Sequence, residues 1–512
     1  MANSHLHFHL LFLFLSFLFS PAISRHISPK TTNTAATSLF DVSTSLSRTQ
    51  LLLSHSHQQQ QQQQQQSVSV VENKNVTNVL SLRLHSRDLF PSTAPPPKDY
   101  TSLTLSRLAR DSARVAAISA RVALALSGIK NSDLEPQQTH KHETAAEEEP
   151  IEGPIASGSS QGSGEYFSRV GVGSPARQLD LVLDTGSDVS WVQCQPCADC
   201  YQQSDPIYDP SASSTYSRLD CASAACASLD VSACGARATC LYQVSYGDGS
   251  YTVGDFATET VTLGGRPLPN VAFGCGHDNE GLFVGAAGLL GLGGGALSFP
   301  SQISARSFSY CLVDRDSPST STLDLHLDLD GESASSGDAV STSLIRNRGV
   351  DTFYYVGLTG IAVGGRVLPI PGSAFEMDAA GGGGVIVDSG TAITRLRRDA
   401  YDALCDAFVG ATGDLARAAA PGVALFDTCY DLSSRRSVEV PTVGLMFGEE
   451  ELRLPAKNYL IPVDSAGTFC LAFAPASSSS SGLSIIGNVQ QQGTRVTFDI
   501  KNSMVGFEAD KC

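Results

Sequence analysis

Short runs of alternating or continuous apolar residues follow one another about every ten positions from Glu165 to the C-terminus. Gly, Pro, Asp and Asn separate the runs, as in "YFSRVGVG", "LYQVSYGDGS", "YYVGLTGIAVGG" and "TRVTFDI". This pattern is typical of short strands joined by turns, so we expect a mostly β body. The clearest helix of this region is predicted at 397–412, "RRDAYDALCDAFVGAT".

One apolar run recurs together with the residues that follow it. "LVLDTGSDVSWV" (181–192) is matched by "VIVDSGTAITRL" (385–396), so three apolar residues precede Asp-[Thr/Ser]-Gly-[Ser/Thr] in both. About a hundred residues after each copy comes an apolar-apolar-Gly segment, "AGLLGLG" (287–293) and "LSIIGNV" (483–489). Two similar halves of roughly 180 residues predict a duplicated β lobe with pseudo-twofold symmetry.

The repeat provides Asp184 with a partner, Asp388. Two symmetry-related carboxylates at about 3 Å cannot both stay ionised, so they share a proton and titrate as a unit. One then serves as a base towards a water molecule, and the other as an acid towards the carbonyl oxygen of an amide. A single Asp-x-Gly-x turn is usually structural, but two copies in matching contexts favour the catalytic interpretation, which requires no metal or other cofactor.

Small and hydroxyl residues flank the two aspartates: Thr185, Gly186, Ser187, Ser389, Gly390 and Thr391. Glycine allows a tight turn with backbone close to the carboxylate. The hydroxyl directly after each aspartate is expected to bond across to the opposite loop. The hydroxyl two positions further on is expected to orient a carboxylate oxygen.

A predicted hairpin tip, "YGDGS" (246–250), follows Asp184 by 62 residues. A mobile hairpin over the cleft would exclude water and order the substrate, with Tyr246, Gly247 and Asp248 contributing. Tyr246 is expected to hydrogen bond to Trp191, the only tryptophan of the chain.

The N-terminal region differs from the body. Residues 1–24, with a Leu/Phe core, predict a cleaved secretory signal sequence, and no other stretch predicts a membrane anchor. Residues 25–75 are of low complexity, with nine consecutive Gln at 58–66, and are expected to be disordered. Asn75 begins the only glycosylation sequon.

Residues 101–126 predict a helix with a basic face, because Arg107, Arg110, Arg114 and Arg121 recur at helical spacing. An acidic, Gly/Ser-rich linker follows from Glu143 and is a predicted site of proteolysis. Residues 1–150 hold 13 Lys+Arg and 11 Asp+Glu, net +2, whereas 151–512 hold 21 and 40, net −19. The acidic body disfavours nucleic-acid binding, and we expect the basic helix to cover its cleft.

Thirteen cysteines, none before Cys194, indicate an oxidising compartment and up to six disulfides with one cysteine left over. The spacing of Cys194, Cys197 and Cys200 also resembles a zinc site, but exported thiols normally pair first. His277, in "HDNEGLF", is expected to form surface hydrogen bonds rather than to bind a metal.

Five phrases carry a resemblance to a known family: "ASGSSQGSGEYFSRVGVGSPA", "CADCYQQSDP", "FGCGHDNEGLF", "FSYCLVDRDS" and "SIIGNVQQQGTR". From about Glu165 to Cys512 the chain resembles the pepsin-like aspartic proteases, in particular their plant nepenthesin-like branch. The resemblance implies a mostly β, bilobed pepsin-like fold and a secreted endopeptidase made as a zymogen. It also implies activity at acidic pH, a preference for large apolar residues beside the scissile bond, protein or peptide substrates, and inhibition by pepstatin-type compounds.

By the same resemblance the catalytic residues are Asp184 and Asp388, and the flap tyrosine is Tyr246. The implied organisation is a signal peptide (1–24), a propeptide (25–155), an N-terminal lobe (156–345) and a C-terminal lobe (346–512). We expect a monomer that is exported to the extracellular space, with the endoplasmic reticulum or vacuole as alternatives.

The resemblance also suggests disulfide pairs. Those implied are Cys311–Cys512, Cys429–Cys470, Cys194–Cys197, Cys200–Cys275, Cys221–Cys240 and Cys226–Cys234, which leaves Cys405 as a buried free thiol. Two other functions stay open. One is a catalytically inactive pepsin-fold binding or inhibitor protein, since plant proteins of this fold inhibit microbial xylanases. The other, a surface receptor or structural glycoprotein, is disfavoured by the lack of a predicted anchor and of sequons in the body.

Overall fold

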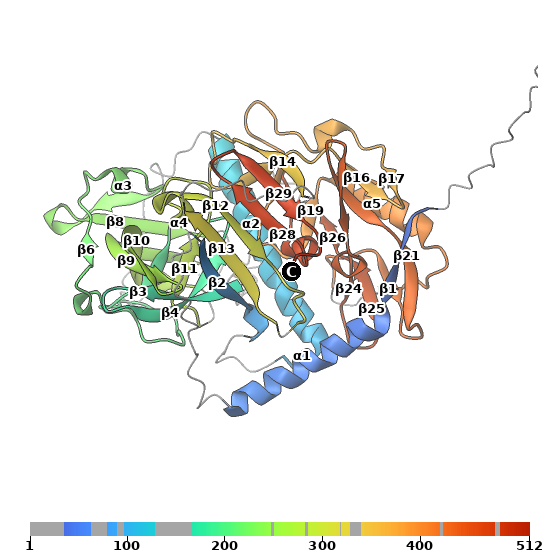
Figure 1. The fold of residues 1–512 in the computed structure, drawn as a ribbon, viewed down its shortest axis with the longest axis horizontal. Coiled ribbons are helices and arrows are strands. Elements are labelled where there is room, and N and C mark those ends of the chain that lie inside the picture. Colours follow the sequence, from blue (N-terminus) through green and yellow to red (C-terminus); the bar gives the residue numbers. More distant parts are fainter. Residues whose placement is uncertain are drawn as a thin grey trace, which may run out of the picture. The chain divides into compact units, whose positions relative to one another are not determined.

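Strands dominate the part of the chain that the structure describes, as the sequence predicts (Figure 1). The structure is a computed structural model, and it describes residues 35–62, 79–89, 97–127, 166–246, 250–281, 285–317, 319–327, 339–419, 423–476 and 482–512. The described residues belong to one compact unit, 35–512. The predictions for the signal sequence, the sequon at Asn75, the acidic linker, Gly247 and Asp248 lie outside the described residues.

An antiparallel sheet joins the two halves of the body. In order across the sheet its strands are β2 (Val79–Ser86), β13 (Ser321–Leu327), β12 (Ala305–Cys311), β28 (Arg495–Asp499), β29 (Met504–Glu508) and β14 (Val340–Ile345). Ser309 lies opposite Thr497 in the central pair, β12 with β28. Three strands lie on each side of this pair's midline, but β2, the outer strand on the N-terminal side, comes from residues that precede the duplicated halves.

The two aspartate motifs have the same topology. In the N-terminal half, β4 (Arg177–Asp184) runs parallel to β11 (Gly288–Gly291), which is antiparallel to β5 (Trp191–Gln193). In the C-terminal half, β18 (Val385–Val387) runs parallel to β27 (Ser484–Ile486), which is antiparallel to β19 (Thr394–Leu396). The predicted duplication of strand, turn and later buried strand is therefore confirmed.

A glycine that ends or follows each later strand explains the repeated apolar-apolar-Gly pattern. A Cβ atom on Gly487 would lie 2.6 Å from the carbonyl oxygen of Ala392, and one on Gly291 would overlap the carbonyl oxygen of Asp188. Asp188 and Ala392 are each the fourth residue after a motif aspartate. Only glycine lets the strand approach both aspartate turns so closely.

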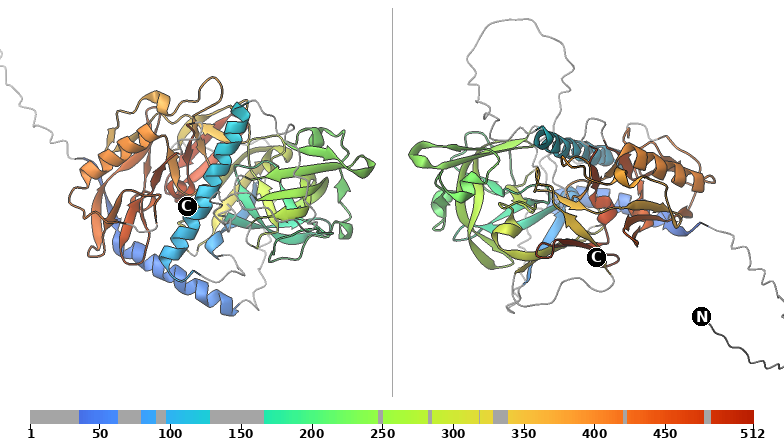
Figure 2. Two further views of the ribbon diagram at one scale, coloured as in Figure 1. Left: turned by 180° about the vertical axis from the view of Figure 1, so that it is seen from behind. Right: turned by 90° about the horizontal axis from the view of Figure 1, so that it is seen from above.

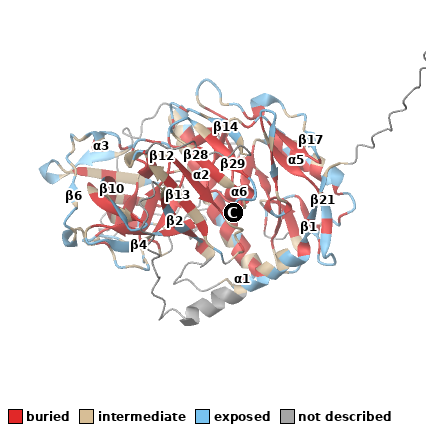
Figure 3. Ribbon diagram, in the orientation of Figure 1, coloured by how far each residue is buried: buried red, intermediate tan, exposed pale blue. Residues whose placement is uncertain are grey.

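The remaining elements complete the two halves around apolar cores (Figure 3). The N-terminal half adds β3 (Tyr166–Val172), β6 (Ser217–Arg218), α3 (Ala224–Ala227), β7 (Ser232–Cys234), β8 (Cys240–Ser245), β9 (Tyr251–Leu263), β10 (Arg266–Glu280) and α4 (Phe299–Gln302). The C-terminal half adds β15 (Tyr354–Val356), β16 (Gly360–Val363), β17 (Arg366–Val367), α5 (Arg398–Ala411), β20 (Cys429–Asp431), β21 (Ser437–Pro441), β22 (Val443–Phe447), β23 (Glu450–Leu454), β24 (Leu460–Pro462), β25 (Thr468–Leu471), β26 (Phe473–Pro475) and α6 (Asn488–Gln491). The helix predicted at 397–412 is confirmed as α5.

The expectation of disorder over 25–75 is wrong for its middle part. Residues there form β1 (Thr37–Asp41) and α1 (Val42–Gln62). β1 adds an antiparallel strand to β21, and Phe40 is buried edge-on against Phe469 with ring centroids 5.4 Å apart. This short apolar segment is therefore ordered because its backbone pairs with the edge of β21 and its Phe40 side chain is buried.

The helix predicted at 101–126 is confirmed as α2 (Tyr100–Leu126), which begins after the N-cap Asp99. Both views of Figure 2 show α2 between the strands of the N-terminal half and those of the C-terminal half. Its apolar residues Val115, Ile118 and Val122 are buried in a cluster with side chains of the C-terminal half, including Phe353. With this face buried, the arginines of the helix point towards carboxylates of the body and towards Asp88 of the N-terminal region.

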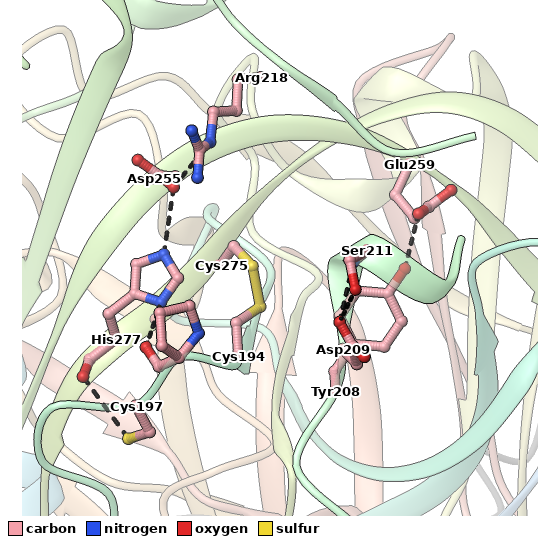
Figure 4. Close-up of a disulfide and its surroundings, with 12 residues drawn as sticks. Cys194, Cys197, Tyr208, Asp209, Ser211, Arg218, Asp255, Glu259, Cys275 and His277 are labelled. Atoms are coloured by element: carbon pink, nitrogen blue, oxygen red, sulfur yellow. Dashed lines mark hydrogen bonds and ion pairs between the residues drawn. A yellow bond between two sulfur atoms is a disulfide. The ribbon is translucent and has the colours of Figure 1, made fainter. Parts of the chain in front are cut away.

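Two of the implied disulfides, Cys311–Cys512 and Cys429–Cys470, are confirmed, as is the buried free thiol of Cys405. The four implied pairs of the N-terminal half are wrong. The structure pairs Cys194–Cys275, Cys197–Cys200, Cys221–Cys234 and Cys226–Cys240. Figure 4 shows the first of these disulfides.

Strand pairing and burial explain these differences. β5 runs parallel to β10, and the amide of Cys194 donates to the carbonyl of Gly276, which places Cys194 beside Cys275 at a Cα separation of 5.3 Å. Cys226 and Cys240 are both buried in the core, whereas Cys234 is exposed. Buried cysteines therefore pair with each other, and Cys234 pairs with the half-buried Cys221.

Candidate active site

The two aspartates of the repeat meet at the junction of the halves. Asp184 ends β4, Asp388 follows β18, and both are 1% exposed. The Thr185 hydroxyl donates to Oδ1 of Asp388 (3.1 Å) and lies 3.1 Å from the Ser389 hydroxyl, and its oxygen accepts the Ser389 amide (3.0 Å). The predicted bonds across the two loops are thus present.

Hydroxyls and backbone amides also fix each carboxylate from its own loop. Ser187 donates to Oδ2 of Asp184 at 2.5 Å, and the Gly186 amide donates to Oδ1 at 2.9 Å. The amide and hydroxyl of Thr391 donate to Oδ2 of Asp388 at 2.8 and 2.7 Å. The predicted orienting hydroxyls therefore take up these positions, and the carboxylate planes are held before any substrate arrives.

Arg114 of α2 fills the space between the two carboxylates. Its Nε and Nη2 donate to Oδ2 and Oδ1 of Asp388 at 3.0 and 2.8 Å. Its Nη1 donates to Oδ2 of Asp184 at 2.8 Å, and Nη2 also donates to Oδ1 of Asp184. All four carboxylate oxygens therefore accept from one guanidinium, which is itself buried. The sequence predicted a basic helix over the cleft, but helical spacing alone did not distinguish Arg114 from the other three arginines.

The two motif glycines make room for this guanidinium. A Cβ atom on Gly390 would lie 2.7 Å from Cζ of Arg114, and a Cβ on Gly186 would overlap its Nη2. The sequence predicted that these glycines bring the backbone close to the carboxylates; the structure shows that they also allow close approach of the group between the two aspartates. In this structure that group is the guanidinium of Arg114.

The ion pair changes the electrostatics of Asp184. Burial raises the pKa of a carboxyl, but the charge of Arg114 and the hydrogen bonds from Arg114, Ser187 and Gly186 outweigh it and hold the pKa of Asp184 below its ordinary value. Burial likewise lowers the pKa of Arg114, but Asp184 and Asp388 raise it well above the ordinary value. With α2 in place, Asp184 is thus an ionised partner of a cation.

Further buried polar contacts hold α2 in the cleft. Asp111 accepts the backbone amides of Ala392 and Ile393 at 2.6 and 3.2 Å, and the Arg395 guanidinium at 2.5 Å. These contacts attach the helix to the loop that follows Asp388. Asp111 lies about one helical turn before Val115 of the apolar cluster, so polar and apolar contacts hold neighbouring turns of the helix.

The N-terminal part of α2 has its own ion-pair cluster. Arg107 contacts Asp88 at 2.6 Å and Asp316 at 3.0 Å, and Arg110 lies 3.6 Å from Asp88. The hydroxyl of Tyr100 donates to Asp316 at 2.7 Å. Burial raises the pKa of a carboxyl here too, but Arg107 and Arg110 hold the pKa of Asp88 below its ordinary value.

The predicted hairpin is closed by a hydrogen bond from the Tyr246 amide to the Ser250 carbonyl (2.8 Å). The Trp191 indole donates to the Tyr246 hydroxyl at 2.8 Å, as the sequence predicts. Between this hairpin and α2 lies a cavity of about 540 Å³, lined by residues of α2, of the first aspartate turn and of 228–231. Tyr246 therefore lines the same cavity as α2.

His277 lies away from this site. Its ring nitrogens are 3.1 Å from Oδ2 of Asp255 and 3.0 Å from the carbonyl oxygen of Pro196, and Asp255 also pairs with Arg218 (Figure 4). The hydrogen bond to Asp255 raises the pKa of His277. These contacts fit the structural role that the sequence favours.

The cysteine triplet that resembles a zinc site does not form one. Cys194, Cys197 and Cys200 are all in disulfides, so none supplies a thiolate. Within the described ranges no group of three or more His, Cys, Asp or Glu side chains is arranged to hold a metal ion. None of the helices that the structure describes is both long enough and apolar enough to cross a bilayer.

Family models match both halves of the body. The model described as "Xylanase inhibitor N-terminal" covers residues 166–325, and "Xylanase inhibitor C-terminal" covers residues 353–509. Among known relatives, "Aspartyl protease family protein 2" from Arabidopsis thaliana is 51% identical over 438 residues, 85% of each chain. "Protein ASPARTIC PROTEASE IN GUARD CELL 2" from the same plant is 46% identical over 84% of this chain and 87% of the relative. "Aspartic proteinase nepenthesin-1" from Nepenthes gracilis is 41% identical over 69% of this chain and 79% of the relative.

Solved structures share the fold at lower identity. The structure titled "Crystal structure of edgp" superposes with a TM-score of 0.55 at 22% identity and covers 67% of this chain and 91% of its own. The structure of conglutin gamma, a basic 7S globulin from lupine seeds, superposes with a TM-score of 0.53 at 21% identity. It covers 67% of this chain and 91% of its own. At this identity the comparison establishes the two-lobed β architecture alone.

Proposed function

The chain belongs to the plant branch of the pepsin-like aspartic proteases and is an aspartic endopeptidase, and we propose that Asp184 and Asp388 are its catalytic pair. The observation that carries this proposal is the convergence of both carboxylates on one guanidinium, with matching hydroxyl and amide donors behind each. Two carboxylates in this arrangement, once the cation leaves, share one proton.

The proposed reaction uses the two carboxyl groups in different protonation states. The ionised carboxylate removes a proton from a water molecule placed between them, and that water attacks the carbonyl carbon of the scissile amide. The protonated carboxyl gives its proton to the carbonyl oxygen, which forms a tetrahedral diol. The carboxyl that took the proton from water then gives it to the amide nitrogen, and the other carboxylate removes a proton from a diol hydroxyl as the C–N bond breaks. The amine and the new carboxylic acid leave, and the pair again holds one shared proton.

We propose that α2 keeps the precursor inactive. Arg114 occupies the position between the carboxylates that the water and the substrate carbonyl need, and Asp111 attaches the same helix to the loop after Asp388. The helix in this way competes directly with substrate. This role agrees with the net charge of +2 on residues 1–150 and −19 on the remainder.

Acidification favours release of the helix. Asp88 lies in the N-terminal region itself, so its ion pairs with Arg107 and Arg110 stabilise that region rather than its attachment to the body. The pKa of Asp184 is lowered in the folded precursor, so its ion pair with Arg114 holds α2 on the body fully above the ordinary aspartate range, about pH 4. That stabilisation is lost as the pH falls through the lowered value. The helix is therefore held at neutral pH and loosened in acid, where a carboxyl pair with one shared proton is active.

We propose that the chain consists of an export signal, a propeptide and two lobes. Residues 1–24 direct export, 25–155 form the propeptide, and 156–345 and 346–512 form the two lobes, with cleavage in the acidic linker. Six disulfides favour an oxidising compartment. We propose secretion to the extracellular space, with the endoplasmic reticulum or vacuole as alternatives, and action as a monomer on protein or peptide substrates.

The family models take their names from xylanase inhibitors, so an inactive binding protein is the second candidate. An inhibitor has no need of a proton-sharing pair. This chain keeps both aspartates, all four flanking hydroxyls and the Trp191–Tyr246 hydrogen bond, which favours the enzyme.

Cleavage of denatured globin by acid-treated protein, measured from pH 3 to 7, tests the proposal. We expect activity in the acidic part of this range, inhibition by pepstatin, and loss of at least a thousandfold in Asp184→Asn and in Asp388→Asn. Activity that persists with pepstatin or in either variant contradicts the assignment of the pair.

A further inference from the structure

Arg121 of α2 lies two helical turns beyond Arg114 and has three binding partners of its own. Its guanidinium is 3.0 Å from the carboxylate of Asp230 and 3.9 Å from that of Asp188. Its Cζ also lies 5.7 Å from the ring centroid of Phe353. A cation is therefore bound between two carboxylates and an aromatic face, beside the cavity of about 540 Å³.

The partners of Arg121 come from the body rather than from the N-terminal region. Asp188 belongs to the first aspartate turn, where the Thr352 hydroxyl donates to it at 2.5 Å and the Gly295 amide at 2.9 Å. Phe353 is buried, whereas the side chain of Asp230 is 55% exposed. These contacts to Asp188 do not involve α2, so its carboxylate keeps its orientation when α2 leaves.

From this geometry we infer that Asp230, with Asp188 and Phe353, forms a substrate subsite that selects a basic side chain. The inference rests on the proposed function, because it takes α2 as a segment held in the substrate cleft. Arg121 then marks where a substrate Arg or Lys binds after the helix is removed. A carboxylate and an aromatic face together favour a guanidinium or ammonium over a neutral side chain of equal length.

The helix also gives the position of the subsite along the substrate. Seven residues separate Arg114 from Arg121, and a rise of about 1.5 Å per residue makes this roughly 10 Å along the axis. An extended peptide advances about 3.3 Å per residue. A basic residue about three positions from the scissile bond therefore reaches the subsite, in addition to the apolar residues expected next to the bond.

The test is a set of peptides with one fixed apolar scissile pair. Arg, Lys, Gln or Glu is placed in turn two, three or four residues from the bond on either side. We measure kcat/KM on acid-processed enzyme at pH 5.5, where ordinary aspartates are ionised. At one position about three residues from the bond, we expect the kcat/KM of the Arg and Lys peptides to exceed that of the Gln peptide about fivefold. A partly exposed ion pair with a cation–π contact has an effect of this size.

Variants assign this preference to the subsite. Asp230→Asn is expected to reduce the Arg-to-Gln ratio towards one, and Asp230→Lys to favour Glu. Asp402→Asn is the matched control, since Asp402 is a similarly exposed aspartate (50%) paired with Arg398 on α5, away from the cleft. It is expected to keep the wild-type preference.

Absence of any preference for Arg or Lys in the wild type overturns the inference, as does a preference that survives both Asp230 variants. Failure of the proposed function looks different, because then even the Gln peptides show no pepstatin-sensitive cleavage.

Discussion

Replacing Arg114 by Gln removes the cation that all four oxygens of the aspartate pair accept from in the precursor. The side chain is 7% exposed, so screening by solvent is weak. Breaking a buried ion pair costs about 3–5 kcal/mol, because the partner charge is left uncompensated. Here the two carboxyls relieve part of that cost by sharing a proton, so about 3 kcal/mol is the relevant figure.

This loss of stability affects the closed state of the precursor, in which α2 is docked between the two halves. At about 1.4 kcal/mol per factor of ten, 3 kcal/mol raises the population with an open cleft by roughly a hundredfold. The contacts of Asp111 and the apolar face of α2 remain, so the protein still folds with the helix docked most of the time. We therefore expect partial activity in an intact chain, without cleavage of the linker.

The assay is the initial rate of hydrolysis of a quenched fluorescent peptide at pH 6, with gel electrophoresis to confirm that the precursor is intact. Arg121→Gln is the matched control on the same helix, since its ion pair is 32% exposed and contributes about 0.2–1 kcal/mol, a change of fivefold or less. The double variant Arg114→Gln/Asp184→Asn is expected to be inactive. A folded Arg114→Gln precursor as inactive as the wild type refutes the reasoning, as does equal activation by Arg121→Gln.

Three further outcomes are expected. The protection factors of the α2 amides in the precursor stay high at pH 7 and fall as the pH drops below about 4, because the pKa values of Asp184 and Asp88 are lowered in the folded state; protection factors that do not change with pH contradict this. Tyr246→Phe removes the acceptor of the Trp191 hydrogen bond and lowers kcat/KM of the processed enzyme by about three- to tenfold with an unchanged melting temperature, measured with an apolar peptide. One thiol per chain, Cys405, reacts with a thiol reagent only after denaturation, because burial protects it and raises its pKa to about 11; rapid labelling of the native protein is the contrary result.

The sequence predicted the parts of the site that local motifs determine. Asp184 and Asp388 could be paired because a duplicated segment implies a symmetry axis, and the axis brings equivalent residues together. The hydroxyls of Thr185 and Thr391 could be assigned because their offset from the aspartate is fixed by the turn. The β architecture and the helix α5 could be predicted because the spacing of apolar residues depends on the local backbone geometry of strands and helices.

Features that depend on tertiary placement were not predictable. Arg114 shares its helical spacing with three other arginines, and only the docked position of α2 selects it for the aspartate pair. The strand β1 exists because β21 offers an edge and a buried position for Phe40, neither of which is visible in a polar, low-complexity stretch. Disulfide partners such as Cys194 and Cys275 follow from strand register, which cysteine spacing does not reveal.

The central claim is that one site is both the catalytic pair and the binding site of Arg114 in the precursor. Calorimetric titration with pepstatin at pH 6 tests it most directly, because the inhibitor requires the space between Asp184 and Asp388. We predict binding of one equivalent by the acid-processed enzyme, binding by the intact Arg114→Gln precursor with lower affinity, and no measurable binding by the intact wild-type precursor. Equal affinity of pepstatin for the wild-type precursor and the processed enzyme contradicts the claim.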